Sequence, residues 1–214
     1  MQVSKIMTRN PVFIHPELSL TDARSLMDKE RIGHLPVLNK NNELVGLITR
    51  ADLIKAGPSS ATTLDMYEIS YLLSKLKVEK VMEKNVIIVQ ENEVVEEAAR
   101  IMADQGIGCL PVLNGSLLTG IITDTDIFHF FINAYGARHK GIRITINFKE
   151  KRGQFAAFAG AVAEKGGNIV AVVTSEGDDV AHRRATIKIT DISRADVEEI
   201  AAALDGAEIE DIRE

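Results

Sequence analysis

The chain has 214 residues, of which 45% are hydrophobic and 26% charged, and its formal net charge is −6. This composition is typical of a globular protein and argues against a generally basic surface that would bind nucleic acid. No apolar run approaches the roughly 18–20 residues of a membrane helix, the N-terminus lacks a signal-peptide core, and the single cysteine, Cys109, allows neither an internal disulfide nor a thiol-rich metal site. The sequence therefore predicts a cytoplasmic protein without membrane or nucleic-acid partners and without a metal.

Residues 3–54 and 78–128 are two copies of one pattern. They align at an offset of 75 up to Asn39 and Asn114 and of 74 thereafter, with eighteen identical positions. The identical pairs include Met7/Met82, Gly33/Gly108, Pro36/Pro111, Gly46/Gly120, Thr49/Thr123 and Asp52/Asp126. One copy is too short to bury a good core alone. We therefore predict a single two-repeat domain over residues 1–137, with a pseudo-twofold axis relating the copies.

Each copy predicts the same succession of elements. A short strand (12–14; 86–89) is followed by a helix, which Ser19 and Asp22 open in the first copy. An apolar strand (34–38; 109–113), a turn and a second strand (44–49; 118–123) come next. Asp52 and Asp126 then fall just inside a further helix. The connector, residues 55–77, reads as a loop over 55–63 and an amphipathic helix over 64–77.

A different periodicity begins near residue 141. Alternating apolar residues predict strands at 143–148, 169–174, 181–189 and 207–212, with a turn at 177–179. A helix is expected over 153–165, ended by Gly166 and Gly167, and another after Ser193 through residue 204. The order β-α-β-β-α-β is the ferredoxin-like plan. The predicted fold class is α+β, with a second domain over residues 141–214.

The repeats resemble the CBS domain, and the pair resembles a Bateman module. The resemblance rests on the opening Met-Thr, the Ile-Gly-His-Leu-Pro-Val run at 32–37, and the Gly-x-x-Thr-x-x-Asp ends at 46–52 and 120–126. The third unit resembles an ACT domain over residues 148–172, although Arg152 stands where a proline often precedes the glycine. The order CBS–CBS–ACT is similar to the AcuB group, named for acetoin utilisation.

The CBS resemblance implies that the clefts between the repeats bind adenosine-containing ligands. A carboxylate at a helix start can accept hydrogen bonds from both ribose hydroxyls, and a helix N-terminus with a threonine hydroxyl can donate to a phosphate. Each aspartate alone could instead be a structural helix carboxylate. The residues expected at the nucleotide are Thr8, Pro11, Ile32, Gly33, His34, Leu35, Thr49, Arg50, Asp52, Asn85, Val86, Ile107, Gly108, Cys109, Leu110, Thr123 and Asp126.

The two clefts are not expected to be equal. Arg50 stands in the first Thr-x-x-Asp motif, with His34 and Lys55 nearby, whereas Asp124 stands in the second. A carboxylate beside a polyphosphate costs on the order of 1 kcal/mol at an effective dielectric constant of 20. We therefore expect phosphorylated ligands to favour the cleft of Asp52. The orientation of Asp124 toward solvent is an open alternative.

The ACT resemblance implies a small-molecule site where the first loop meets the second strand of a partner chain. The matching residues here are Arg152, Gly153, Gly167, Asn168 and Ile169. The alternative is a domain that only dimerises.

These features predict a ligand-sensing regulatory protein rather than an enzyme. The sequence contains none of the P-loop, Gly-x-Ser-x-Gly or zincin motifs. No cofactor is required on this reading; the expected effector is AMP, ADP, ATP or a compound like S-adenosylmethionine. A homodimer and an unidentified regulated protein are the expected partners. The alternative function is a docking or scaffold module that binds no nucleotide.

Overall fold

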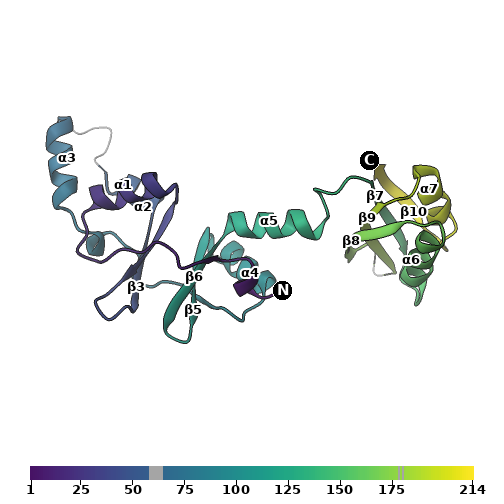
Figure 1. Cartoon of the computed structure of the whole chain (residues 1–214), viewed down its shortest axis with the longest axis horizontal. Helices are drawn as coiled ribbons and strands as arrows, with labels where there is room; N and C mark the ends of the chain where they lie inside the picture. Colours follow the sequence, from purple (N-terminus) through teal and green to yellow (C-terminus); the bar gives the residue numbers. More distant parts are fainter. Residues whose placement is uncertain (58–64, 178, 180) are drawn as a thin grey trace. The chain divides into compact units, whose positions relative to one another are not determined.

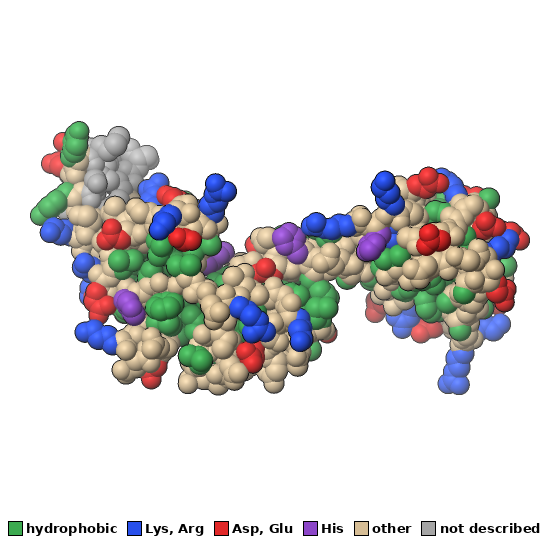
Figure 2. Space-filling model, viewed as in Figure 1, with side chains coloured by type: hydrophobic (Ala, Val, Ile, Leu, Met, Phe, Trp, Pro, Cys, Tyr) green, Lys and Arg blue, Asp and Glu red, His purple; other side chains and the backbone are tan. Residues whose placement is uncertain are grey.

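The computed structural model describes residues 1–57, 65–177, 179 and 181–214. The chain divides into two compact units, Met1–Ile127 and Phe128–Glu214 (Figure 1). Among the helices described, none has the length and apolar character needed to cross a bilayer. Figure 2 shows acidic and basic side chains interspersed on the visible face of each unit, so that face carries no large patch of one sign.

The first unit contains two copies of one architecture, each a β-hairpin with a helix before it and a helix after it. Its helices and strands, in chain order, are η1 (Val3–Lys5), β1 (Thr8–Arg9), α1 (Leu20–Glu30), β2 (His34–Leu38), β3 (Leu44–Thr49), α2 (Arg50–Lys55), α3 (Met66–Lys75), η2 (Val78–Lys80), β4 (Val89–Gln90), α4 (Val95–Gln105), β5 (Cys109–Asn114), β6 (Leu117–Thr123) and α5 (Asp124–Ala134). Helix α5 continues into the second unit. The tandem-repeat organisation predicted from the sequence is therefore present.

Most of the elements predicted in the repeats are present, but the first strand is not. The Ser19 hydroxyl accepts a hydrogen bond from the Asp22 amide and caps α1, as predicted. The strand predicted at 12–14 is reduced to a single bridge at Ile14, and pairing occurs earlier, at β1. Asn10 has a left-handed φ of 47°, and Pro11, which follows it, has no backbone N–H to donate. Both features interrupt the extended chain. The strand predicted at 86–89 shrinks to β4, and the connector helix is α3. Residues 58–64, most of the predicted loop, lie outside the described residues.

The start of each sequence repeat packs in the half formed by the other repeat. Thr8 and Arg9 pair with β6, and Glu83 forms the equivalent bridge with Leu47 of β3. Met7 lies against Gly120, and Met82 lies against Gly46. The sequence repeat is therefore not the structural half, because a short N-terminal segment is exchanged in both directions.

The two hydrophobic cores of the first unit correspond at seven of their eight positions; Leu20 of the first core and Met7 of the second are not repeat partners. The first core comprises Ile14, Leu20, Ala23, Met27, Leu35, Val37, Ile48 and Val78. The second comprises Val3, Met7, Val89, Ala98, Met102, Leu110, Val112 and Ile122. The exchanged segments supply Val78 to the first core, and Val3 and Met7 to the second. A small cluster of Leu47, Cys109 and Ile121, with Val86 against it, joins the two hairpins, which lie side by side in Figure 1.

The second unit follows the element order predicted for it. Its elements are β7 (Ile142–Lys149), α6 (Gln154–Glu164), β8 (Asn168–Glu176), β9 (His182–Thr190), α7 (Arg194–Ala202) and β10 (Glu208–Arg213). They form one antiparallel sheet in the order β10-β7-β9-β8. Phe158 and Val162 of α6 and Val197 of α7 pack on the apolar face of this sheet. Ser193 caps α7, as predicted. The predicted turn at 177–179 includes residue 178, which lies outside the described residues.

We predict that Gly46→Ala destabilises the first unit by about 1–3 kcal/mol, the range for overpacking a filled site. A β-carbon there would lie 2.9 Å from Met82 Cγ and 3.1 Å from the carbonyl oxygen of Glu83. Urea unfolding followed by circular dichroism measures the change. Gly33→Ala is the matched control, because no atom lies within 4 Å of its added β-carbon. Equal stability of the two variants would contradict the packing argument.

Candidate functional site

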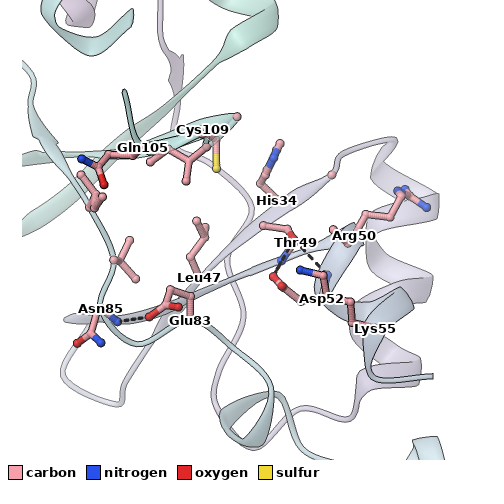
Figure 3. Close-up of a pocket in the computed structure, with 17 residues that line it drawn as sticks. His34, Leu47, Thr49, Arg50, Asp52, Lys55, Glu83, Asn85, Gln105 and Cys109 are labelled. Carbon is pink, nitrogen blue, oxygen red and sulfur yellow. Dashed lines mark hydrogen bonds between the residues drawn. The ribbon is translucent and has the colours of Figure 1, made fainter. Parts of the chain in front are cut away.

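A cavity of about 650 Å³ lies between the two halves of the first unit, beside Asp52 (Figure 3). The first repeat contributes the end of β3 and the start of α2, including Thr49 and Asp52. The second repeat contributes the segment around Asn85 and the approach to β5. The lining residues are Gly33, His34, Leu47, Thr49, Arg50, Ala51, Asp52, Lys55, Glu83, Asn85, Val86, Ile87, Gln105, Gly106, Ile107, Gly108 and Cys109. The volume is in the range of small-molecule sites.

A second cavity, of about 430 Å³, repeats this arrangement beside Asp126. Here the second repeat supplies the helix start, and the first repeat supplies the other wall. The lining residues are Thr8, Asn10, Pro11, Val12, Arg31, Ile32, Gly33, His34, Ile121, Thr123, Asp124, Thr125 and Asp126. Each cavity thus combines the Thr-x-x-Asp motif of one repeat with the Ile-Gly segment of the other.

The aspartate of each motif closes the start of its helix with one oxygen. The amide and hydroxyl of Thr49 donate to Asp52 Oδ2 at 2.9 and 2.7 Å, and the Thr49 hydroxyl accepts from the Asp52 amide at 3.3 Å. Asp126 makes the equivalent bonds with Thr123, at 2.8 and 2.8 Å through Oδ2. Within the part of the chain that is described, Oδ1 of each aspartate has no hydrogen-bond partner, so the cap leaves that oxygen available as an acceptor.

The two basic residues of the Asp52 cavity differ in whether their side chains already have hydrogen-bond or ion-pair partners. Arg50 Nη1 donates to Asp28 Oδ1 at 2.6 Å, and Nη2 donates to the carbonyl oxygen of Ile32 at 3.1 Å. In Figure 3 its guanidinium points away from the centre of the pocket. Lys55 lines the same cavity and has no ion pair among the described residues. Lys55, rather than Arg50, is thus the cation with unengaged donors.

Two titratable groups stand where the cavities approach each other. Burial lowers the pKa of His34 below the ordinary histidine value of 6.5, against the opposing effect of the Asp124 and Asp52 carboxylates. Because the folded protein then binds fewer protons than the unfolded chain, this group contributes stability above about pH 6.5, which is lost as the pH falls through its lowered pKa. Burial, reinforced by the same carboxylates, raises the pKa of Cys109 to about 12.

The predicted nucleotide residues divide between the two cavities, with two exceptions. Thr49, Arg50, Asp52, Asn85, Val86, Ile107, Gly108 and Cys109 line the Asp52 cavity; Thr8, Pro11, Ile32, Thr123 and Asp126 line the Asp126 cavity; Gly33 and His34 line both. Leu35 and Leu110 line neither. Both are fully buried core residues, because inward-facing positions of the strands fill the cores.

Several residues that line the cavities were not predicted from the sequence. Asn10 lies in the Asp126 cavity and is the repeat partner of Asn85, so the alignment of the repeats could have found it. Arg31 ends α1 with a left-handed φ of 55° and also lines that cavity. Its repeat partner is Gly106, so the alignment carried no signal for a cation at this position.

The residues predicted for a site in the second unit do not meet within one copy. Gly153, with φ of 86°, precedes α6, and Asn168 begins β8 after the helix has ended. Eleven helical residues span about 16 Å, at 1.5 Å per residue. Gly153 and Arg152 therefore lie at one end of α6, and Gly167, Asn168 and Ile169 at the other.

The comparison with protein families decides what the first unit is. The CBS domain model matches residues 3–59 and 78–133, together more than half of the chain. The chain belongs to the CBS domain family. Residues 134–214 lie outside the matched ranges, so the CBS match describes the first unit and most of α5.

Solved structures of CBS pairs are similar to this one. The CBS domain pair of protein MJ0100, in complex with 5′-methylthioadenosine and S-adenosyl-L-methionine, is 28% identical, with a TM-score of 0.53 over 65% of this chain and 98% of that one. The Vibrio cholerae protein AcuB, whose name refers to acetoin utilization, is 32% identical, with a TM-score of 0.54 over 64% of this chain and 95% of that one. CBSX2 in complex with AMP is 27% identical, with a TM-score of 0.50 over 61% and 96%.

Several curated relatives are longer proteins, matched over less than a third of their length. L-aspartate semialdehyde sulfurtransferase of Methanocaldococcus jannaschii is 30% identical over 130 residues, which is 60% of this chain but only 23% of that protein. The match thus spans about a quarter of the length of such relatives. Most of that sulfurtransferase lies outside the aligned region, so its enzymatic name describes a protein that this chain matches only in part.

We predict that Cys109 reacts with iodoacetamide at pH 8 at least about 100-fold more slowly than a free cysteine, because its thiol is 4% exposed and little of it is ionised. Mass spectrometry of the alkylated protein measures the rate. The same reaction in urea is the control and should be fast. A folded-state rate equal to that in urea would contradict the burial of Cys109 on the cavity wall.

Proposed function

We propose that the chain is a non-catalytic regulatory protein that senses an adenine nucleotide or another adenosyl compound in the cavities of its CBS pair. One observation carries this proposal. In both cavities a helix-capping aspartate has Oδ2 engaged by the threonine three residues earlier, while Oδ1 has no partner among the described residues. An acceptor held in place in this way suits a pair of ribose hydroxyls. A cytoplasmic location, expected from the sequence, belongs to this proposal.

The ligands bound in the neighbouring structures support an adenosyl ligand. The MJ0100 and CBSX2 CBS pairs were solved with 5′-methylthioadenosine and S-adenosyl-L-methionine, and with AMP. These compounds share adenine and ribose and differ at the 5′ position. Recognition of the shared part falls to the aspartates and to the Ile-Gly segments, where Gly33 and Gly108 allow close approach to a flat base.

The charge of each cavity favours a different 5′ group. The Asp52 cavity has two carboxylates, Asp52 and Glu83, and two cations, Arg50 and Lys55. The Asp126 cavity has two carboxylates, Asp124 and Asp126, and one cation, Arg31. The formal charges are therefore 0 and −1. We propose that phosphorylated nucleosides prefer the Asp52 cavity, and that uncharged or sulfonium compounds prefer the Asp126 cavity.

We predict that Asp52→Asn removes the thermal stabilisation by AMP and that Asp126→Asn removes that by S-adenosyl-L-methionine. The amide oxygen of asparagine keeps the cap, while its NH₂ group cannot accept from ribose. Thermal unfolding at fixed protein concentration measures the effect, since a ligand at 100 times its Kd adds about 2.7 kcal/mol. Without ligand, the free energy of unfolding of each variant should lie within about 1 kcal/mol of that of the natural chain.

Asp22→Asn is the matched control for this experiment. Asp22 accepts from the Ser19 hydroxyl at 2.7 Å at the start of α1 and lines neither cavity. It should leave both ligand effects unchanged. Stabilisation that survives in both cavity variants would contradict the role given to the aspartates. No stabilisation by any adenosyl compound would favour the alternative function, a docking module for another protein.

We further propose that the second unit is an ACT domain that pairs with a second copy of the chain. The sheet order β10-β7-β9-β8 supports this reading, as does the turn glycine, Gly153, before α6. Because Arg152 and Asn168 lie at opposite ends of α6, a small-molecule site that uses both needs two copies. Strand β8 is an outer strand of the described sheet, which leaves its edge for pairing, and Val172 on it presents a 36% exposed apolar side chain beside that edge.

We predict a homodimer of twice the 23.4 kDa mass of one chain, measured by light scattering after size exclusion. Val172→Lys should shift the population toward monomer by placing like charges across the paired edge. Glu176→Lys, at the exposed end of the same strand, is the control for added charge alone. A monomeric natural chain, or a dimer unaffected by Val172→Lys, would contradict pairing through β8.

A further inference from the structure

The two cavities of the CBS pair have a common wall. Of the residues that line them, only Gly33 and His34 line both. Gly33 has no side chain, so His34 is the one residue with a side chain that lines both described cavities. Figure 3 shows it between Thr49 and Cys109.

His34 lies beside the part of each cavity where a phosphate is expected. In the β2–β3 ladder it pairs with Thr49, which opens α2. On its other side, a β-carbon placed on Gly108 would lie 3.9 Å from His34 Nε2 and 3.3 Å from Asp124 Oδ2, so the imidazole and this carboxylate flank the same glycine. Asp124 opens α5 in the second motif. His34 therefore stands between the starts of the two helices.

The groups that face the imidazole are acidic or neutral. Asp52 on α2 and Asp124 on α5 favour its protonated form, while burial disfavours that form more strongly. The Cys109 thiol on β5 stays protonated because its pKa is raised to about 12. The other charged residues on the cavity walls are Arg31, Arg50, Lys55, Glu83 and Asp126. An added anion in either cavity would shift the imidazole toward its cation.

We propose that His34 couples the two cavities, so that a phosphorylated nucleoside bound in one cavity tightens the binding of a second in the other. The first anion favours the protonated imidazole, and the protonated imidazole attracts the second anion. An uncharged nucleoside lacks this effect. The inference rests on the proposed function, because it takes both cavities to bind adenosyl compounds.

The first test needs no ligand. NMR titration of the imidazole signals of the full chain gives the pKa of His34, with His34→Gln assigning its signal. Asp52→Asn and Asp124→Asn should each lower that pKa, because each removes a carboxylate that favours the cation. Asp22→Asn, remote from the cavity walls, should leave it unchanged. A pKa that responds to only one of the two cavity carboxylates, or to neither, would overturn the coupling.

The second test measures the coupling by calorimetric titration with AMP and with adenosine at pH 6. In the natural chain, AMP bound in one cavity should lower the Kd of AMP for the other cavity by at least about fivefold. In His34→Gln, AMP in one cavity should leave the Kd of the other cavity unchanged. Adenosine should show no such change even in the natural chain. The comparison is made at a single pH, because a phosphate monoester itself titrates near about pH 6.

The outcomes separate the two proposals. AMP that binds both cavities with the same coupling in the natural chain and in His34→Gln would overturn the role of His34 and leave the proposed function standing. Failure of AMP and adenosine to bind would overturn the proposed function and, with it, the coupling of nucleosides. In that case the ligand-free titration still shows whether the imidazole senses both carboxylates.

Discussion

The exchange of short segments between the two repeats is the constraint on which the first unit depends. Val3 and Met7 complete the second core, and Val78 completes the first. Each methionine of the exchanged segments lies over a glycine of the opposite hairpin, where a side chain would collide with it. Neither half can therefore keep its core when the other is removed. The halves are held with their helix starts facing the opposite repeat, and the two cavities form there.

Under the proposed function, the same residues serve folding and recognition. Asp52 closes the start of α2 through Oδ2 and also lines the cavity. A carboxylate fixed by its own helix loses little conformational entropy when a ligand binds, which favours affinity. This dual use also explains why an alanine substitution would be hard to interpret. It would remove a cap and a ligand acceptor together, whereas asparagine separates them.

Most of the element order of both units could be predicted from the sequence, because it depends on local patterns; the strand expected at 12–14 is the exception. Ser19 and Asp22 mark a helix start, and alternating isoleucines mark β7 and β9, whatever the rest of the chain does. The segment exchange could not be predicted in this way. Two similar repeats offer equivalent surfaces, and nothing local to Met7 says which hairpin it covers. The orientation of Arg50 was likewise out of reach, because it depends on Asp28 of α1, 22 residues earlier.

Several differences between the repeats fall on the walls of the cavities. Core positions keep their character across the repeats, as Ala23 and Ala98 or Met27 and Met102 show. Some wall positions change charge or chemistry: Arg50 becomes Asp124, Arg31 becomes Gly106, and His34 becomes Cys109. One imidazole shared by both walls, with no second imidazole at the equivalent position, makes the pair electrically asymmetric about its pseudo-twofold axis. A symmetric scaffold with asymmetric walls can therefore distinguish two ligands that differ only in the charge of their 5′ group.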